Sequence, residues 1–179
     1  ITRQETEEKL AFRSRHVFPK FSVLDPTVTF SLPKHQIANG VVDAFVHVME
    51  QYYTTTQDVE IQDRFSEGIL KTLIALGPQM IAAEQPDYQT RANFMWAATM
   101  ALNGLIACGV TEDWSTHHIG HELTAFHGLD HAVTLAIVLP GVMKATKMLR
   151  HDKLLQYAQR VWDLDISQPG AADQAIAKT

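Results

Sequence analysis

The sequence predicts a mainly α-helical bundle preceded by a short β segment. Three observations support this fold class. From Lys34 onward, apolar residues recur three and four positions apart, the spacing that places them on one face of a helix. Residues 1–33 have instead a β-friendly pattern interrupted by prolines. Hydrophobic residues make up 46% of the 179 residues, which suits a globular chain with one sizeable core.

The β segment is expected to hold one or two strands. Phe21–Leu24 alternates in polarity, and Asp25-Pro26 ends it. Thr27–Leu32 is again rich in β-branched and aromatic residues, and Pro33 closes it. Because an isolated pair of strands is marginally stable in water, we expect these strands to pair with a sheet that lies outside this chain.

The helical part should contain six helices, and another helical pattern begins in the closing stretch DISQPGAADQAIAKT. Asp58 precedes the second helix, which Gly77-Pro78 should weaken or end, and Pro140 should kink or stop the fifth. The alanine-rich third run is so apolar that it should lie centrally. The first predicted helix begins at Lys34, and the second follows Asp58. The other four cover Asp87–Cys108, Ser115–Phe126 before Gly128, the stretch after Asp130 to Val142, and Lys153–Val161.

Composition excludes several classes of protein. A net charge of −5 argues against a general nucleic-acid binder, which needs a basic face. No apolar run reaches the roughly 18 residues of a membrane span. The polar first residues predict no secretory leader. The single cysteine, Cys108, has apolar neighbours and is interpreted as a core residue that cannot form an internal disulfide, which fits a reducing cytoplasm.

Asp43 and His47 form the first candidate metal-binding pair. They are four residues apart in the first predicted helix, so they lie on one face, one turn apart. Such a pair is more often a surface pair or a helix-internal hydrogen bond than a metal site. Here, however, the neighbouring residues are apolar, and a buried charge needs a partner.

The second candidate cluster is denser, because five of the nine histidines fall between His117 and His131. His117 and His121 share a helix face, whereas His118 is rotated by about 100°. Gly128 breaks this helix, so that His131 can begin the next one and face back towards His117. Imidazole is a favoured ligand for zinc and iron. The spacing therefore predicts a metal site at which two helices and a helix start meet. An HExxH motif is absent, which disfavours a zinc protease.

Three stretches resemble the iron-containing (group III) alcohol dehydrogenases. VVDAFVHVMEQY is similar to their GxDAxxHxxE segment, and THHIGHELTAFHGLDHAVTLAIVLP is similar to their H-x3-H-x9-H signature. FSVLDPTVTFSLP resembles the DPxxTxxLP link between their two domains. The likeness runs from Ile1 to at least Trp162, and its wording is closest to the butanol-dehydrogenase-like branch, which reduces aldehydes with NADPH.

This resemblance implies a function and a set of site residues. The metal ligands would be Asp43, His47, His117 and His131, holding Fe2+ or else Zn2+. His121 would be a catalytic residue beside the metal, and Lys9 would contact the ribose of NADP(H), which is favoured over NAD(H). Hydride would pass between this cofactor and a small alcohol or aldehyde. The resemblance also implies a cytoplasmic homodimer that binds neither nucleic acid nor membrane.

The chain is expected to be a part of such an enzyme. Residues 1–33 would be the tail of a nucleotide-binding domain with the interdomain link, and residues 34–179 the helical, metal-binding catalytic domain, truncated at its C-terminus. The GGGS loop that cradles the pyrophosphate in this family has no counterpart among the nine scattered glycines. We therefore expect the chain by itself to be inactive.

Two other functions compete with this one at the level of sequence. Helical metal-dependent phosphohydrolases are also rich in His and Asp, and His151-Asp152 resembles their HD doublet. That doublet lies in the polar stretch RHDK, where Asp152 is better explained as a helix cap. A non-catalytic helical interaction module, with structural histidines, is the remaining alternative.

Overall fold

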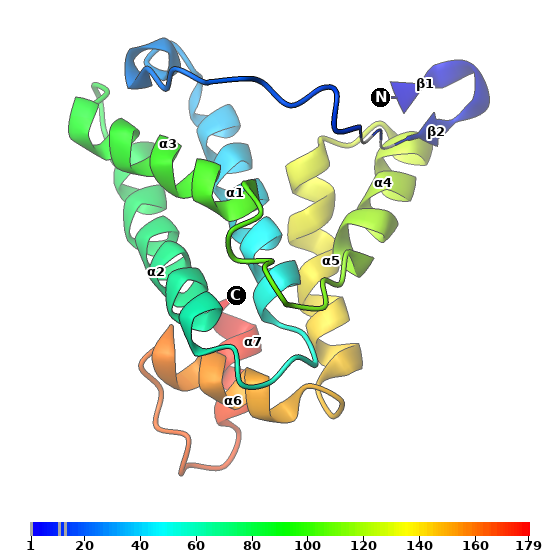
Figure 1. Ribbon diagram of the computed structural model, residues 1–179, viewed down its shortest axis with the longest axis vertical. Helices are drawn as coiled ribbons and strands as arrows, with labels where there is room; N and C mark the ends of the chain where they lie inside the picture. The colour runs from blue at the N-terminus through cyan, green and yellow to red at the C-terminus, as the bar shows by residue number, and fades with distance from the viewer. Residues whose placement is uncertain (1, 11, 13) are drawn as a thin grey trace.

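The computed structural model describes residues 2–10, 12 and 14–179. Its main body is a set of helices around the long helix α1 (Figure 1). α1 contacts α2, α3, α4 and α5, while α6 packs on α7 at the end of the molecule opposite η2. The helices are α1 (Lys34–Tyr52), α2 (Glu60–Ala82), α3 (Tyr88–Leu102), α4 (Ser115–His127), α5 (His131–Thr146), α6 (His151–Arg160) and α7 (Ala171–Lys178). The mainly helical fold expected from the sequence is confirmed.

The β segment differs from the expectation. The two short strands are β1 (Thr2–Arg3) and β2 (Glu8–Lys9), which pair antiparallel around the 3₁₀ helix η1 (Gln4–Thr6). The strands predicted over Phe21–Leu24 and Thr27–Leu32 are absent from the described structure. Instead, Pro26–Thr29 forms the 3₁₀ helix η2, since the Asp25 carboxylate accepts hydrogen bonds from the Thr27 amide at 2.9 Å and hydroxyl at 2.7 Å. This local capping holds the backbone in a turn in which no sheet partner is needed.

Between these two features the chain crosses one end of the bundle. Figure 1 shows this crossing segment, described here over residues 12 and 14–25, leading from the side of β2 and α4 to η2, beside α3. Large apolar side chains in this crossing segment are solvent-exposed, among them Phe18 at 76% and Phe21 at 82%. The crossing segment therefore contributes little to the core.

Neither internal proline ends its helix. α2 continues through Pro78 and α5 through Pro140, although each proline removes one helical hydrogen bond. Buried residues beyond both prolines, Met80 and Met143, show why: packing of the following turn offsets the lost bond. In contrast, α3 ends at Leu102 and not at Cys108, and its central position was wrong, because Trp96 is 58% exposed. Cys108 is also exposed, so its interpretation as a core residue was wrong.

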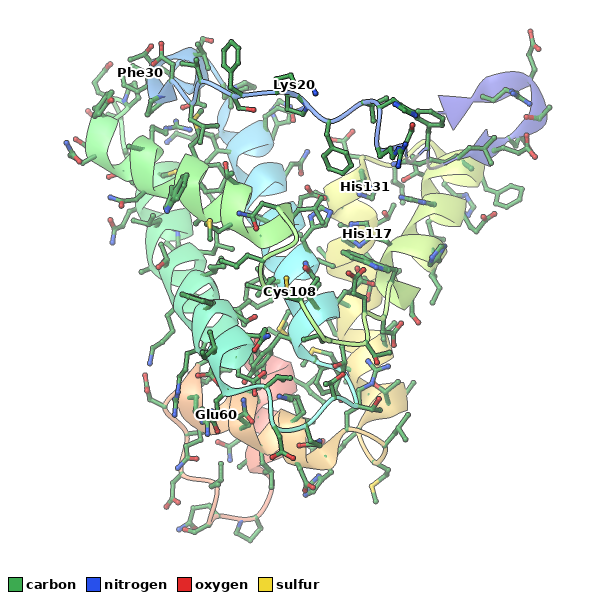
Figure 2. All side chains as sticks on the ribbon, in the orientation of Figure 1. Lys20, Phe30, Glu60, Cys108, His117 and His131 are labelled. Atoms are coloured by element: carbon green, nitrogen blue, oxygen red, sulfur yellow. The ribbon has the colours of Figure 1, made fainter. Side chains whose placement is uncertain are left out.

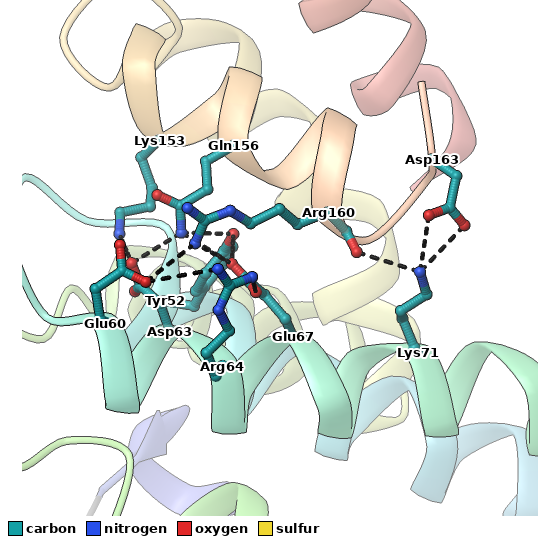
Figure 3. Close-up of polar contacts among 10 residues, drawn as sticks. All are labelled: Tyr52, Glu60, Asp63, Arg64, Glu67, Lys71, Lys153, Gln156, Arg160 and Asp163. Atoms are coloured by element: carbon teal, nitrogen blue, oxygen red, sulfur yellow. Dashed lines mark hydrogen bonds and ion pairs between the residues drawn. The ribbon is translucent and has the colours of Figure 1, made fainter. Parts of the chain in front are cut away.

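A buried polar network joins α1, α2 and α6 (Figure 3). Lys153, only 2% exposed, donates to Asp63 at 2.6 Å, and Gln156 donates to Asp63 at 2.8 Å and to Glu67 at 2.9 Å. The Tyr52 hydroxyl also donates to Glu67, at 3.1 Å. Burial raises the pKa of Tyr52, so this hydroxyl stays protonated. The network fixes the C-terminal end of α1 against two other helices.

Gly120 allows α4 to approach α5 closely. A Cβ atom at this position would lie 2.8 Å from Thr134 Oγ1 and 3.2 Å from Leu135 Cδ2, and both neighbours are fully buried. We expect Gly120→Ala to destabilise the protein by about 1–2 kcal/mol in thermal unfolding, because an overpacking cost of about 1–3 kcal/mol exceeds the gain of up to about 1 kcal/mol in helix propensity. Gly68→Ala is the matched control.

At Gly68, also inside a helix, a Cβ atom would have no neighbour within 4 Å. The control should therefore stabilise the protein by up to about 1 kcal/mol. Equal effects of the two substitutions would contradict close packing at Gly120.

Candidate metal centre

α1 presents a stripe of three polar side chains towards α4 and α5. Asp43, His47 and Glu50 are spaced i, i+4 and i+7, so they share one face of the helix. The stripe runs through an otherwise apolar surface, since Ala44, Val46 and Val48 are buried in the core. Asp43 and His47 are partly buried, and Glu50 is only 4% exposed.

His117 and His131 come to the same place from two consecutive helices. α4 ends at Gly128, whose φ of 65° is the left-handed conformation that glycine adopts without a side-chain penalty. α5 then starts at His131, so the two histidines lie where α4 and α5 face α1 (Figure 2). Asp130, just before α5, accepts a hydrogen bond from the Asn39 side chain of α1 at 3.1 Å, which ties this helix start to α1.

Three of the predicted ligands converge on one point. Asp43 Oδ1 lies 3.4 Å from His131 Nε2 and 4.0 Å from His117 Nε2. Asp43, His117 and His131 each offer one ligand atom, and these atoms all lie within 4.8 Å of one another. Two ligand atoms about 2.1 Å from one tetrahedral ion would be roughly 3.4 Å apart, so these separations suit a shared metal ion.

Unsatisfied polar atoms support the same interpretation. Asp43 Oδ1, His117 Nε2 and His131 Nδ1 are buried without a hydrogen-bond partner among the described residues. Such atoms cost free energy unless something pairs with them. A divalent cation would satisfy the first two, and a carboxylate with imidazoles is a donor set that iron and zinc accept. The residues present therefore fit a metal.

His47 is next to this group and stands slightly apart from it. Its ring centroid is 4.5 Å from that of His117, and its Nδ1 is 3.4 Å from Asp43 Oδ2. The same nitrogen lies 2.8 Å from the Asp43 carbonyl oxygen one turn back, so Nδ1 is the hydrogen-bonded nitrogen and Nε2 is left for a ligand. Burial, partly offset by Asp43, lowers the pKa of His47 and keeps its ring neutral.

His121 borders the cluster on its other side. Its ring centroid lies 6.1 Å from that of His117 and 5.2 Å from that of His131. Burial, followed by the charge of Lys9, lowers the pKa values of both His121 and His131 to about 4. Both rings are therefore neutral at pH 7, as a metal ligand or a proton acceptor must be.

Lys9 lies at the edge of the site. It belongs to β2, which packs on α4, and its charge acts on His121, His131 and Asp43. Burial lowers the pKa of Lys9 itself. A cation at this position can attract an anionic or hydroxyl-rich ligand towards the cluster.

Two cavities open beside the cluster. One of about 310 Å³ is lined by Asp43 and His131 together with Asn39 and Asp130. The other, about 530 Å³, is lined by Trp114, Leu102, Phe12 and Phe18, and the Trp114 ring centroid is 5.5 Å from that of His117. The cluster is thus accessible through a polar opening, and a second, mainly apolar cavity lies next to Trp114.

Glu50 is a site residue that the sequence analysis did not single out. It touches His117 through both carboxylate oxygens. Two signals were available in the sequence: its i+7 spacing from Asp43, and its match to the last position of the GxDAxxHxxE segment. By contrast, the HD doublet of the competing phosphohydrolase hypothesis is exposed: His151 and Asp152 begin α6 without a metal-binding group around them in the described structure, and Arg150 and not Asp152 is the N-cap.

Comparisons with known proteins identify the family of the chain. Residues 37–178 match the family model described as Fe-containing alcohol dehydrogenase family, C-terminal. The chain is 58% identical to the NADPH-dependent aldehyde reductase YqhD of Escherichia coli, over all of this chain and 46% of that protein. It is 40% identical to the NADH-dependent butanol dehydrogenase B of Clostridium acetobutylicum, again over all of this chain and 46% of that protein.

Solved structures give the same result. The substrate- and cofactor-free form of the E. coli aldehyde reductase superposes with a TM-score of 0.91 at 56% identity, over 99% of this chain and 47% of that one. NADH-dependent butanol dehydrogenase A from Thermotoga maritima superposes with a TM-score of 0.93 at 34% identity, over 99% and 44%. The chain therefore spans about half the length of the relatives it matches.

Proposed function

Because this chain belongs to the Fe-containing alcohol dehydrogenase family, we propose that it forms the metal- and substrate-binding side of an enzyme that interconverts aldehydes and alcohols with a nicotinamide cofactor. The observation that carries the proposal is the convergence of Asp43, His117 and His131 next to His47. Residues 1–33 would then be the link to a nucleotide-binding domain, and residues 34–179 the catalytic domain.

Asp43, His47, His117 and His131 are the proposed ligands of a divalent metal, Fe2+ or Zn2+. A metal held there would act as a Lewis acid that polarises the carbonyl oxygen of the substrate during hydride transfer. Neutral histidines suit this task, since three imidazoles with one carboxylate leave the site positively charged towards an anionic oxygen. The polar opening lined by Asp43 and His131 gives the substrate oxygen access.

His121 and Lys9 take the two other proposed roles. A neutral His121, beside the ligands, can accept a proton from the alcohol, and its protonated form can return one to the product of aldehyde reduction. Lys9 would contact a ribose hydroxyl of the cofactor. The apolar cavity between the crossing segment and Trp114 would hold the carbon chain of the substrate.

The cofactor and the assembly belong to the proposal as well. The relative with 58% identity is named NADPH-dependent, and this supports NADP(H) over NAD(H), although the butanol dehydrogenases are named for NADH. The described residues include no helix that meets the length and apolarity of a membrane span. We propose a cytoplasmic homodimer for the full-length enzyme.

A chimera tests the function directly. In it, this chain replaces the matching stretch of the E. coli aldehyde reductase, which is 58% identical. Purified with Fe2+ or Zn2+, the chimera should oxidise NADPH when an aldehyde is added, and chelation should abolish the reaction. The 179-residue chain alone should not oxidise NADPH, because dinucleotide binding needs a glycine-rich turn at a helix N-terminus. A folded chimera that holds metal and NADPH without reducing any aldehyde would disprove the proposal.

Removing the His121 imidazole should separate turnover from metal binding. In the chimera, we expect His121→Ala to keep its metal content and to lose about 10²–10⁴-fold in kcat, the range for loss of a general acid–base group. His127→Ala, on the exposed end of the same helix, is the control and should retain full activity. Metal loss in His121→Ala, measured by elemental analysis, would show that His121 is a ligand.

A further inference from the structure

Glu50 is a buried carboxylate whose charge no lysine or arginine neutralises in the described part of the chain. Both of its oxygens are directed at one residue. Oε1 accepts the backbone N–H of His117 at 3.1 Å, and Oε2 accepts a hydrogen bond from His117 Nδ1. Burying an ionised carboxylate is costly, and two hydrogen bonds to one histidine are what offsets this cost here.

We propose that Glu50 is the positioning residue that fixes the tautomer and the orientation of His117, an inference that rests on the proposed metal site. When Nδ1 donates its proton to Glu50, the lone pair of the neutral ring is on Nε2. That nitrogen points into the cluster, 4.0 Å from Asp43 Oδ1, and has no hydrogen-bond partner among the described residues. Glu50 thus presents Nε2 to the ion.

His47, the histidine of the stripe, is oriented in a different way from His117. His47 Nδ1 donates to the carbonyl oxygen of Asp43, one turn back in its own helix. His117 instead receives its acceptor from α1, across the interface between α1 and α4. A charged carboxylate is also a stronger hydrogen-bond acceptor than a carbonyl, so it holds the ligand ring more firmly. α1 supplies ligands and also orients a ligand that belongs to α4.

The backbone around Glu50 holds it in register with α4. Its carbonyl oxygen accepts the Asp113 N–H at 2.9 Å, and the Asp113 carboxylate in turn accepts the Ser115 N–H at 2.9 Å at the start of α4. Arg150 pairs with the same carboxylate and donates to the Tyr53 carbonyl at 2.9 Å. The end of α1 and the start of α4 are therefore fixed to each other, which keeps the Glu50–His117 contact independent of a bound ion.

The first test uses the metal-free 179-residue protein. Nitrogen-15 NMR of the imidazoles should find His117 with its proton on Nδ1, and Glu50→Ala should release it from this tautomer. Glu67→Gln is the matched control: Glu67 is as buried as Glu50, at 5% exposure, and belongs to the network around Gln156. It should leave His117 unchanged. A His117 ring that is protonated on Nδ1 in Glu50→Ala as in the unaltered protein would overturn the inference.

The second test measures binding of Co2+ by its visible absorption, in competition with a chelator. We expect Glu50→Gln and Glu50→Ala to weaken binding by about 10–100-fold, the usual effect of losing an outer-shell partner, while Glu67→Gln keeps the original affinity. If circular dichroism shows that Glu50→Ala does not fold, the Co2+ affinity of Glu50→Gln is the deciding measurement. Unchanged affinity in a folded Glu50→Gln would contradict the inference. Absence of Co2+ binding in the unaltered protein would instead refute the proposed metal site, and the tautomer measurement would still decide the effect of Glu50 on His117.

Discussion

Replacing Asp43 by asparagine should abolish specific metal binding. Asp43 is the anion of the cluster, and its Oδ1 faces the Nε2 atoms of both His117 and His131. Asparagine keeps the volume but removes the negative charge that balances a divalent cation. We expect the affinity for Co2+ or Zn2+ to fall by more than the roughly 10–100-fold that outer-shell partners account for. Competition with a chelator measures this loss.

His118→Ala is the matched control for this experiment. His118 neighbours His117 in sequence, but it is exposed and points away from the cluster. The His118→Ala variant should bind metal as the unaltered protein does. If Asp43→Asn binds with the original affinity while His118→Ala loses metal, the ligand set proposed here is wrong.

The same affinity measurement can rank the contribution of His47 to metal binding against that of Asp43. His47 lies beside the group formed by Asp43, His117 and His131 but is not one of its three members. His47→Ala should therefore weaken binding less than Asp43→Asn does. Equal losses would indicate that His47 moves fully into the coordination shell when the ion binds.

The sequence predicted the helical elements better than their ends. Spacing and caps located α1 and α4, because Gly128 stops a helix in a way that single residues can reveal. Pro78 and Pro140 do not end their helices, as the sequence allowed, since whether a helix continues past proline depends on what the next turn packs against. The strands expected over residues 21–32 also failed, because strand formation needs partners that a local pattern does not contain.

The site was visible in the sequence to the extent that helix periodicity controls it. The i, i+4 pairs placed Asp43 with His47 and His117 with His121, and the break at Gly128 let His131 turn back. Glu50 was missed, because its role depends on the tertiary approach of α4 to α1. The contact between Lys153 and Asp63 is even harder to predict from spacing, because the two residues are 90 positions apart in the sequence.

Lys153→Met should cause a large loss of stability without touching the metal site. Lys153 is 2% exposed, and its Nζ lies 2.6 Å from Asp63 Oδ2 (Figure 3). Removing the cation leaves the Asp63 carboxylate buried, and among the described residues only the amide of Gln156 still donates to it. Breaking a buried pair in this way typically costs about 3–5 kcal/mol. For a chain of this size, that corresponds to a fall in Tm of about 6–20 °C.

Lys71→Met is the matched control, and the ion pair of Lys71 is drawn in the same figure. Lys71 pairs with Asp163 at 2.9 Å, but both side chains are exposed, at 47% and 75%. Because water screens such a pair, Lys71→Met should cost at most about 1 kcal/mol. Adding Asp63→Asn to Lys153→Met should restore part of the lost stability, since asparagine can still accept from Gln156 but carries no charge to leave uncompensated. Similar Tm values for the two lysine variants would show that burial does not set the strength of this network. A further loss in the double variant would show that the uncompensated charge of Asp63 is not the source of the cost.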